Sequence, residues 1–117
     1  MTLFDSTSLV LQKAMSGAAM RQSVLSSNMA NANTPGYIRR DVDFSGQLRD
    51  AMADGTDISN VQFTASEDKN AVLRADGNGV DVDVEGAALA QNELHYEALV
   101  SVSAARLDIL RYAMGVR

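Results

Sequence analysis

Acidic side chains gather between Asp76 and Glu85, and carboxylates at such short intervals are typical ligands of Ca²⁺. An EF-hand loop needs oxygen ligands at its first, third and fifth positions, Gly at the sixth and Glu at the twelfth. Counted from the first acid, the fifth, sixth and twelfth positions hold Val80, Asp81 and Ala87. Three required positions therefore fail, and we interpret the stretch as a solvated turn followed by a helix cap.

The chain has one histidine, His95, and no cysteine, so a transition-metal site lacks a second imidazole or a thiolate. His95 lies between Glu93 and Glu97 on a predicted helix, and we interpret it as a structural side chain. The sequence contains no Gly-x-Ser-x-Gly motif and no phosphate-binding glycine motif. It therefore predicts a protein that is not an enzyme, with no catalytic residue, metal, cofactor or small-molecule substrate.

The net charge of −5 over 117 residues argues against nucleic acid as a partner, because phosphate contacts need a basic surface. Apolar residues make up 46% of the chain and aromatic residues only 5%, so we expect helices that pack through small side chains. The first residues show no basic segment followed by a continuous apolar run. We therefore expect neither a cleaved signal peptide nor a membrane-spanning helix.

The stretch 26–37, SSNMANANTPGY, ends a first apolar pattern of helical period. Pro35 biases Thr34 away from the α region, so this helix should end by about Ala32 or Asn33. Pro35 and Gly36 suit the central positions of a type II turn, where Gly supplies the positive φ. The side chains that we expect to shape the helix end and the turn are Asn28, Asn31, Asn33, Thr34, Pro35, Gly36 and Tyr37.

Two helical patterns occupy the ends of the chain, from about residue 6 to 31 and from about 84 to 114. Asp83 is the expected N-cap of the second helix, and Gly115 the residue that follows its end. Both helices repeat apolar residues every seven positions, which predicts a mainly α protein whose long terminal helices pack as a coiled-coil-like pair. The repeats are Phe4, Leu11, Ala18, Leu25 and Ala32 in the first helix, and Ala88, His95, Val102, Ile109 and Val116, joined by Leu99, in the second.

Because two such helices leave apolar surface uncovered, we expect the chain to assemble with copies of itself or with other subunits. The expected assembly stripe consists of Leu11, Ala18, Leu25, Leu99, Val102 and Ile109.

The middle of the chain is acidic and turn-rich. We expect a short helix around Leu48 that ends near Gly55, and short strands over 61–65 and 71–73. The chain then divides into three parts: the first helix with its signature (1–34), an irregular or short-strand middle (35–83), and the second helix (84–117).

Four segments of the sequence resemble the flagellar basal-body rod protein family, and most closely its proximal-rod members. The first is the run Asn31, Asn33, Thr34, Pro35, Gly36 and Tyr37, which is similar to the Asn-x-Asn-Thr-Pro-Gly-Tyr signature that follows the first helix in that family. The others are YIRRDVDF at 37–44, NGVDVDVE at 78–85 and LHYEA at 94–98. Residues 49–76 carry no such resemblance.

The resemblance implies a structural subunit of the proximal rod, exported by the flagellar type III apparatus without a cleaved signal. Such subunits stack through their terminal helices into the rod that crosses the periplasm and transmits torque. The implied partners are other rod subunits and the export-gate and membrane-ring components of the basal body. Two alternatives remain: another proximal- or distal-rod subunit, the latter usually with a larger inserted domain, or a small enzyme or metal-binding module.

Overall fold

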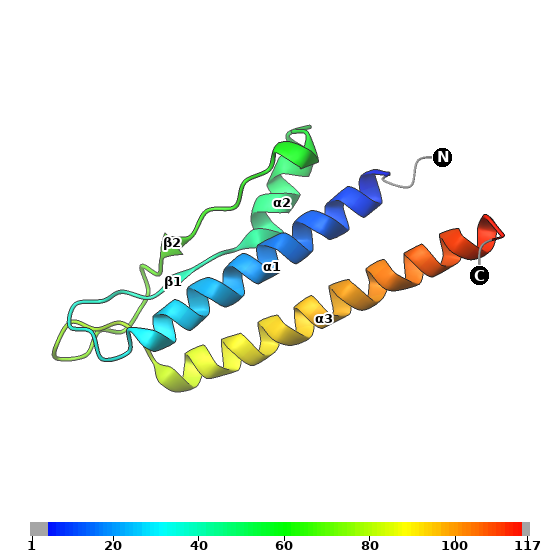
Figure 1. Ribbon diagram of the computed structural model, residues 1–117. Coiled ribbons are helices and arrows are strands. Elements are labelled where there is room, and N and C mark those ends of the chain that lie inside the picture. The colour runs from blue at the N-terminus through cyan, green and yellow to red at the C-terminus, as the bar shows by residue number, and fades with distance from the viewer. Residues whose placement is uncertain (1–4, 116–117) are drawn as a thin grey trace.

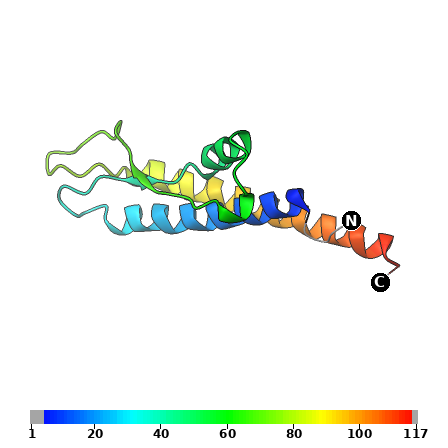
Figure 2. The same cartoon turned by 90° about the horizontal axis from the view of Figure 1, so that it is seen from above.

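A computed structural model describes residues 5–115 as an elongated molecule of about 62 × 32 × 15 Å. Helices α1 (Ser6–Ala30) and α3 (Val82–Ala113) run antiparallel along its length, side by side (Figure 1). The middle of the chain lies along one side of this pair (Figure 2). The predicted fold class, mainly α with a long terminal helix pair, is confirmed. Within residues 5–115, no helix is both long and apolar enough to cross a membrane.

Helix α1 begins and ends close to the predicted positions. The Asp5 side chain caps it by accepting a hydrogen bond from the Ser8 backbone N–H at 2.9 Å. Asn31 follows the last helical residue as C-cap. The type II turn is confirmed, because Gly36 has a φ of +74° and the Tyr37 backbone N–H donates to the Thr34 carbonyl at 3.2 Å.

Helix α3 begins two residues earlier than predicted. Asp81, not Asp83, is the N-cap, because its carboxylate accepts from the backbone N–H groups of Asp83 and Val84. Asp83 is instead an acidic residue of the first turn. The predicted helix end is confirmed, since Gly115 has a φ of +73° directly after the C-cap Met114. Phe4 and Val116, the outermost members of the predicted repeats, lie outside the described residues.

The predicted short helix is α2 (Phe44–Ala53), which is capped by Asp43 and followed by Gly55 at φ +73°. The predicted strands are wrong. The observed antiparallel pair is β1 (Arg40–Asp41) and β2 (Ser66–Glu67), and residues 58–60 form the 3₁₀ helix η1 (Ile58–Asn60). The run 61–65 is not a strand because side chains satisfy its backbone groups.

Those side chains come from the two helices next to the run. The Val61 carbonyl accepts from Lys13 Nζ at 2.9 Å. The Thr64 backbone N–H donates to the Gln47 side-chain oxygen and its carbonyl accepts from the Gln47 side-chain nitrogen, each at 2.9 Å.

A small core joins the middle segment to α1. Phe44 packs so closely on α1 that a Cβ added at Gly17 would lie 2.5 Å from the Cβ of Phe44. The Phe44 ring also meets the rings of Phe63 and His95, with centroid distances of 6.3 and 5.3 Å. His95 thus has a structural contact. The buried cluster consists of Ala14, Ala18, Val42, Phe44 and Leu48.

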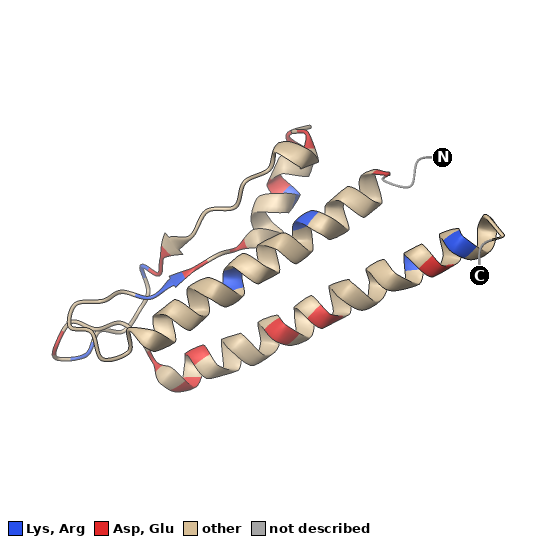
Figure 3. Ribbon diagram, viewed as in Figure 1, with Lys and Arg blue, Asp and Glu red and all other residues tan. Residues whose placement is uncertain are grey.

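Charge is distributed unevenly over the two long helices (Figure 3). The charged residues of α1 are Lys13 and Arg21, and both bond to the middle segment, at the Val61 carbonyl and the Asp41 carboxylate. Helix α3 instead carries exposed charges along its whole length.

Candidate assembly site

Asn28 links three parts of the chain at the end of the helix pair where the signature turn lies. Its buried side-chain amide donates to the Arg40 carbonyl at 2.7 Å and to Glu85 Oε2 at 3.2 Å. Its oxygen accepts from the Arg40 backbone N–H at 3.0 Å and from the Tyr37 hydroxyl at 3.1 Å. One buried amide therefore holds α1, the residues after the turn, and α3 in a fixed relation.

A second buried asparagine, Asn78, holds the turn itself. Its amide nitrogen donates to the carbonyls of Asn31 and Thr34 at 2.9 and 2.7 Å, and its oxygen accepts from the Val80 backbone N–H. The Gly36 backbone N–H donates to the Asp76 carbonyl at 3.0 Å, which joins the turn to the segment before α3. The acidic stretch that suggested a calcium loop is thus a turn packed against the signature.

Of the other predicted turn residues, Asn31 caps the end of α1 by donating to the Ser27 carbonyl at 2.8 Å. The Thr34 hydroxyl donates to the Asn31 side-chain oxygen at 3.1 Å. Asn33 and Pro35 are exposed at the surface. The signature therefore divides into residues that hold the fold and residues that face outward.

An ionic network lies beside Asn28. Arg39 bonds to the fully buried Glu85, to Asp68 at 2.9 Å, and to Asp41 at 3.5 Å. These partners raise the pKa of Arg39, first of all through the hydrogen bond to Glu85, so it stays charged. Burial alone would raise the pKa of Asp41, but hydrogen bonds from Arg21 and the Val42 backbone N–H, with the charges of both arginines, lower it. The base of the helix pair is thus held by one buried carboxylate and by partly buried charges that compensate each other. We call this network, with Asn28, the polar base.

Neither Arg39 nor Glu85 was among the residues that the sequence predicted to hold the fold, although both lie in segments that resemble the rod protein family. The sequence does not show that Asn28, Arg39 and Glu85 meet, because they come together only when the chain reverses direction between α1 and α3. Asn92, which was also missed, is buried in the seam between α1 and α3, where it donates to the Ala18 carbonyl at 2.8 Å.

The predicted assembly residues have different surroundings. Ala18 and Leu25 are fully buried within the single chain, and Leu11 and Leu99 are half-buried between the helices. Val102 and Ile109 are exposed, the latter to 67%. The face of α3 that meets α1 instead has a seven-residue repeat in which polar residues predominate, formed by Glu85, Asn92, Leu99 and Arg106.

The exposed residues of α3 form a second repeat on the side that faces away from α1. Their spacing of three and four residues is that of a helix-packing surface, and none of them is charged. We call this set the outer stripe: Leu94, Ala98, Val102, Ala105, Ile109 and Tyr112.

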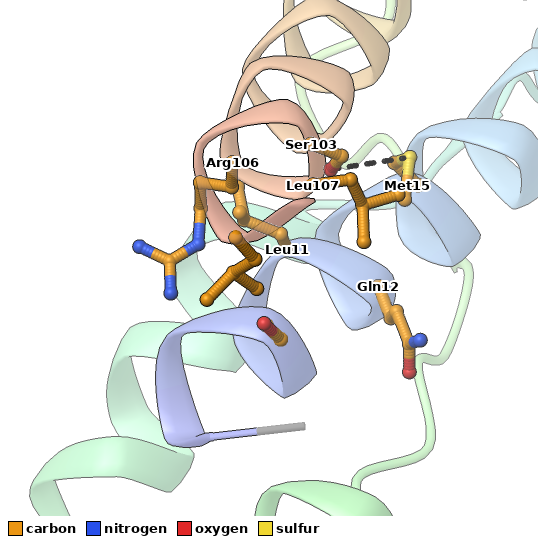
Figure 4. Close-up of a pocket in the computed structure, with 8 residues that line it drawn as sticks. Leu11, Gln12, Met15, Ser103, Arg106 and Leu107 are labelled. Atoms are coloured by element: carbon orange, nitrogen blue, oxygen red, sulfur yellow. Dashed lines mark hydrogen bonds between the residues drawn. The ribbon is translucent and has the colours of Figure 1, made fainter. Parts of the chain in front are cut away.

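Two hollows follow each other along the seam between α1 and α3, and the middle segment lines neither of them. The first is lined by Ala18, Ala19 and Gln22 of α1 and by Asn92, Glu93 and Tyr96 of α3. The second lies nearer the N-terminus of α1 and includes Leu11, Met15, Ser103, Arg106 and Leu107 (Figure 4). There the Ser103 hydroxyl lies 4.0 Å from the sulfur of Met15. We call the two hollows together the seam groove.

Residues 9–37, which span most of α1 and the whole signature turn, match the family model described as "Flagella basal body rod protein". The class that this match indicates is therefore that of the flagellar rod proteins, and it covers the segment that contains Asn28 and the turn.

Relatives extend the match over most of the chain. The flagellar basal body rod protein FlgB of Bacillus subtilis is 35% identical, with 86% of each chain covered. FlgB of Yersinia enterocolitica is 38% identical over 78% of this chain and 80% of its own length. FlgB of Escherichia coli K12 is 35% identical over 77% and 79%. The chain belongs to the FlgB family of flagellar basal body rod proteins.

Proposed function

We propose that this protein is a structural subunit of the flagellar basal-body rod, which assembles through its terminal helices with copies of itself and with other rod subunits. It catalyses no reaction in this role. The observation that carries the proposal is the outer stripe, because a soluble monomer rarely leaves so long an apolar repeat uncovered. The membership of the chain in the FlgB family supports the same role and a location in the basal body.

We further propose that the assembled subunit transmits torque along the rod. A torque-bearing subunit needs helices that do not slide past each other, and the contacts between α1 and α3 meet this need. The polar base ties the helices at one end, and an ion pair between Asp5 and Arg106 at 3.0 Å ties them at the other.

The route and neighbours of the subunit are part of the same proposal. We propose export through the flagellar type III apparatus without a cleaved signal and incorporation into the periplasmic rod next to export-gate and membrane-ring components. The absence of cysteine is compatible with this route, because no disulfide can form during transit. The small core, built mostly from Ala, Val and Leu, is compatible with a chain that unfolds for export.

The test replaces one exposed residue of the outer stripe. In a strain that lacks the native gene, Ile109→Asp should abolish swimming and remove the protein from isolated basal bodies, while its expression stays normal. Met52→Asp is the matched control, because Met52 is also an exposed apolar side chain but lies on α2. Normal swimming with Ile109→Asp would refute assembly through α3. Leu25→Asp is unsuitable for this purpose, because Leu25 is fully buried and the change would test folding instead.

A further inference from the structure

We propose that Asn78, which Gly79 follows, is a site of spontaneous deamidation that the folded chain protects. The reaction is confined to the unfolded or locally opened chain, and a chain that has reacted no longer closes the signature turn (residues 34–37). This inference goes beyond the proposed function and does not depend on it. It follows from the sequence at this position, from the burial of both reacting groups, and from the hydrogen bonds of the Asn78 amide.

The reaction needs only groups that this dipeptide contains and water. The Gly79 backbone nitrogen gives up its proton and attacks the side-chain carbonyl carbon of Asn78. The bond from that carbon to Nδ2 breaks, ammonia leaves with the released proton, and a cyclic succinimide remains. Water then opens the ring at either carbonyl and yields aspartate or isoaspartate. A following glycine favours the attack because it has no side chain to hinder its nitrogen, and Asn78 is the only asparagine of the chain that precedes glycine.

The fold withholds both reacting groups. Asn78 is 0% exposed, and Gly79 is buried beside it. The Gly79 backbone N–H, whose proton must leave, donates to the Tyr37 carbonyl at 2.7 Å. The Asn78 side-chain oxygen accepts from the Val80 backbone N–H at 2.8 Å, which fixes the direction of the amide. Water and hydroxide therefore reach this dipeptide only when the segment opens locally.

The nitrogen that the reaction expels holds the signature turn. Nδ2 of Asn78 donates to the carbonyls of Asn31 and Thr34 at 2.9 and 2.7 Å. An ionised aspartate at this position has no hydrogen to donate, and it places a negative charge against two carbonyl oxygens. An unpaired charge buried there costs free energy. The reaction thus removes the contact by which the segment before α3 holds the end of α1.

Isoaspartate disturbs the segment further. Its main chain runs through the side-chain carbon and so gains one atom before Gly79. This lengthening displaces the Gly79 N–H from the Tyr37 carbonyl and the Val80 N–H from its side-chain acceptor. Because ammonia is lost, the change is not reversed. An unfolded chain therefore has a limited time in which it still folds, whereas the folded chain keeps its amide.

Peptide mapping by mass spectrometry tests the protection in the full chain. The chain is kept in mildly alkaline buffer with and without denaturing urea, and the products at position 78 are followed over time. Asp54→Asn is the matched control, because it creates a second asparagine–glycine pair, with Gly55, on an exposed loop after α2. We expect position 78 to react at least about tenfold more slowly in buffer than in urea, since local opening must come first. The rate at position 54 should differ only a few-fold between the two conditions.

Two glycine variants test whether the signature turn is the part that opens. Gly36→Ala strains the turn, because Gly36 has a φ of +74° and an added Cβ would meet no atom within 4 Å. Gly55→Ala imposes the same strain after α2, with a φ of +73° and again no atom within 4 Å. In buffer, Gly36→Ala should speed the reaction of Asn78 several-fold, and Gly55→Ala should leave it nearly unchanged. Circular dichroism checks that both variants are folded.

Asn78→Asp reproduces the aspartate product and tests its consequence. At neutral pH this change should lower the urea midpoint of the chain. Asn70→Asp is the matched control, because it makes the same change of charge at an exposed position, and it should keep the native midpoint.

Four results would overturn the inference. Equal rates at position 78 with and without urea, or equal protection of positions 54 and 78 in buffer, would show that the closed turn is not what protects Asn78. A lack of product at position 78 in urea would show that the dipeptide is not a site. Equal acceleration by Gly36→Ala and Gly55→Ala would assign the reaction to global unfolding. A native midpoint for Asn78→Asp would show that the amide does not hold the turn.

Discussion

The two ends of the helix pair are held together in different ways. At the polar base, Arg39 and Glu85 form an ion pair whose side chains are 14% and 0% exposed, and Asn28 adds four hydrogen bonds around it. At the opposite end, Arg106 and Asp5 form one ion pair whose side chains are 35% and 44% exposed. The base thus holds the helices in one arrangement. At the open end, apolar residues such as Leu107 and Ile109 are exposed. The chain therefore fixes its two helices by buried polar contacts at one end and by a single, partly exposed ion pair at the other.

The strongest test of this comparison removes one arginine from each end. Arg39→Met should lower the free energy of unfolding by about 3–5 kcal/mol, because it leaves the buried Glu85 carboxylate without its cation. Arg106→Met should cost about 1 kcal/mol or less, since exposed ion pairs contribute little. Urea unfolding followed by circular dichroism measures both. Equal losses would show that the ends do not differ.

A smaller effect is expected where the middle segment packs tightly on α1. Gly17→Ala should destabilise the protein by about 1–3 kcal/mol, because the new methyl group would lie 2.5 Å from the Cβ of the buried Phe44. Gly86→Ala in α3 is the matched control, with its nearest neighbour, Met29 Cε, at 4.0 Å. This change should be neutral or stabilise by up to about 1 kcal/mol through helix propensity. Thermal melts should show a lower midpoint for Gly17→Ala and an unchanged or higher midpoint for Gly86→Ala, and an equal loss in both variants would contradict the packing argument.

The smallest effect is a loss of stability in acid to which the base contributes. The pKa of Asp41 and that of Asp68 are both lowered in the folded chain, the latter first by the hydrogen bond from the Asn70 backbone N–H and then by the one from Arg39. A carboxylate with a lowered pKa stabilises the fold above its unfolded value of about 4, and this contribution is lost as the pH falls through the lower folded value. The urea midpoint should therefore stay constant from neutral pH to about pH 5 and fall below about pH 4.

Asp41→Asn is the variant that assigns part of this loss to the base. It should lower the midpoint at neutral pH and make the acid loss smaller. An acid profile identical to that of the native chain would show that Asp41 makes no such contribution.

The sequence was sufficient where local rules decide the structure. Pro35 and Gly36 predicted the turn and a first helix that ends a few residues before it, and the apolar pattern around Leu48 predicted α2 before Gly55. Each of these features depends on residues a few positions apart.

The parts that could not be predicted depend on contacts between distant residues. The apolar repeat predicted that Val102 and Ile109 pack against the first helix. Polar residues such as Glu85 and Asn92 occupy this seam instead, and Val102 and Ile109 are exposed. A buried polar seam gives no hydrophobic periodicity, so its partners must be known before it can be recognised. The strands failed for a related reason, since the backbone of 61–65 bonds to side chains of α1 and α2.

The charge distribution of α1 determines how contacts along this helix respond to salt. Lys13 and Arg21 are both engaged by the middle segment, so the rest of α1, with residues such as Ser16 and Ser23, presents an uncharged surface. Dissolved ions screen exposed charges beyond a distance of about 8 Å at physiological salt, but they leave contacts between neutral side chains almost unaffected. Contacts made by this uncharged face of α1 would therefore depend little on the salt concentration.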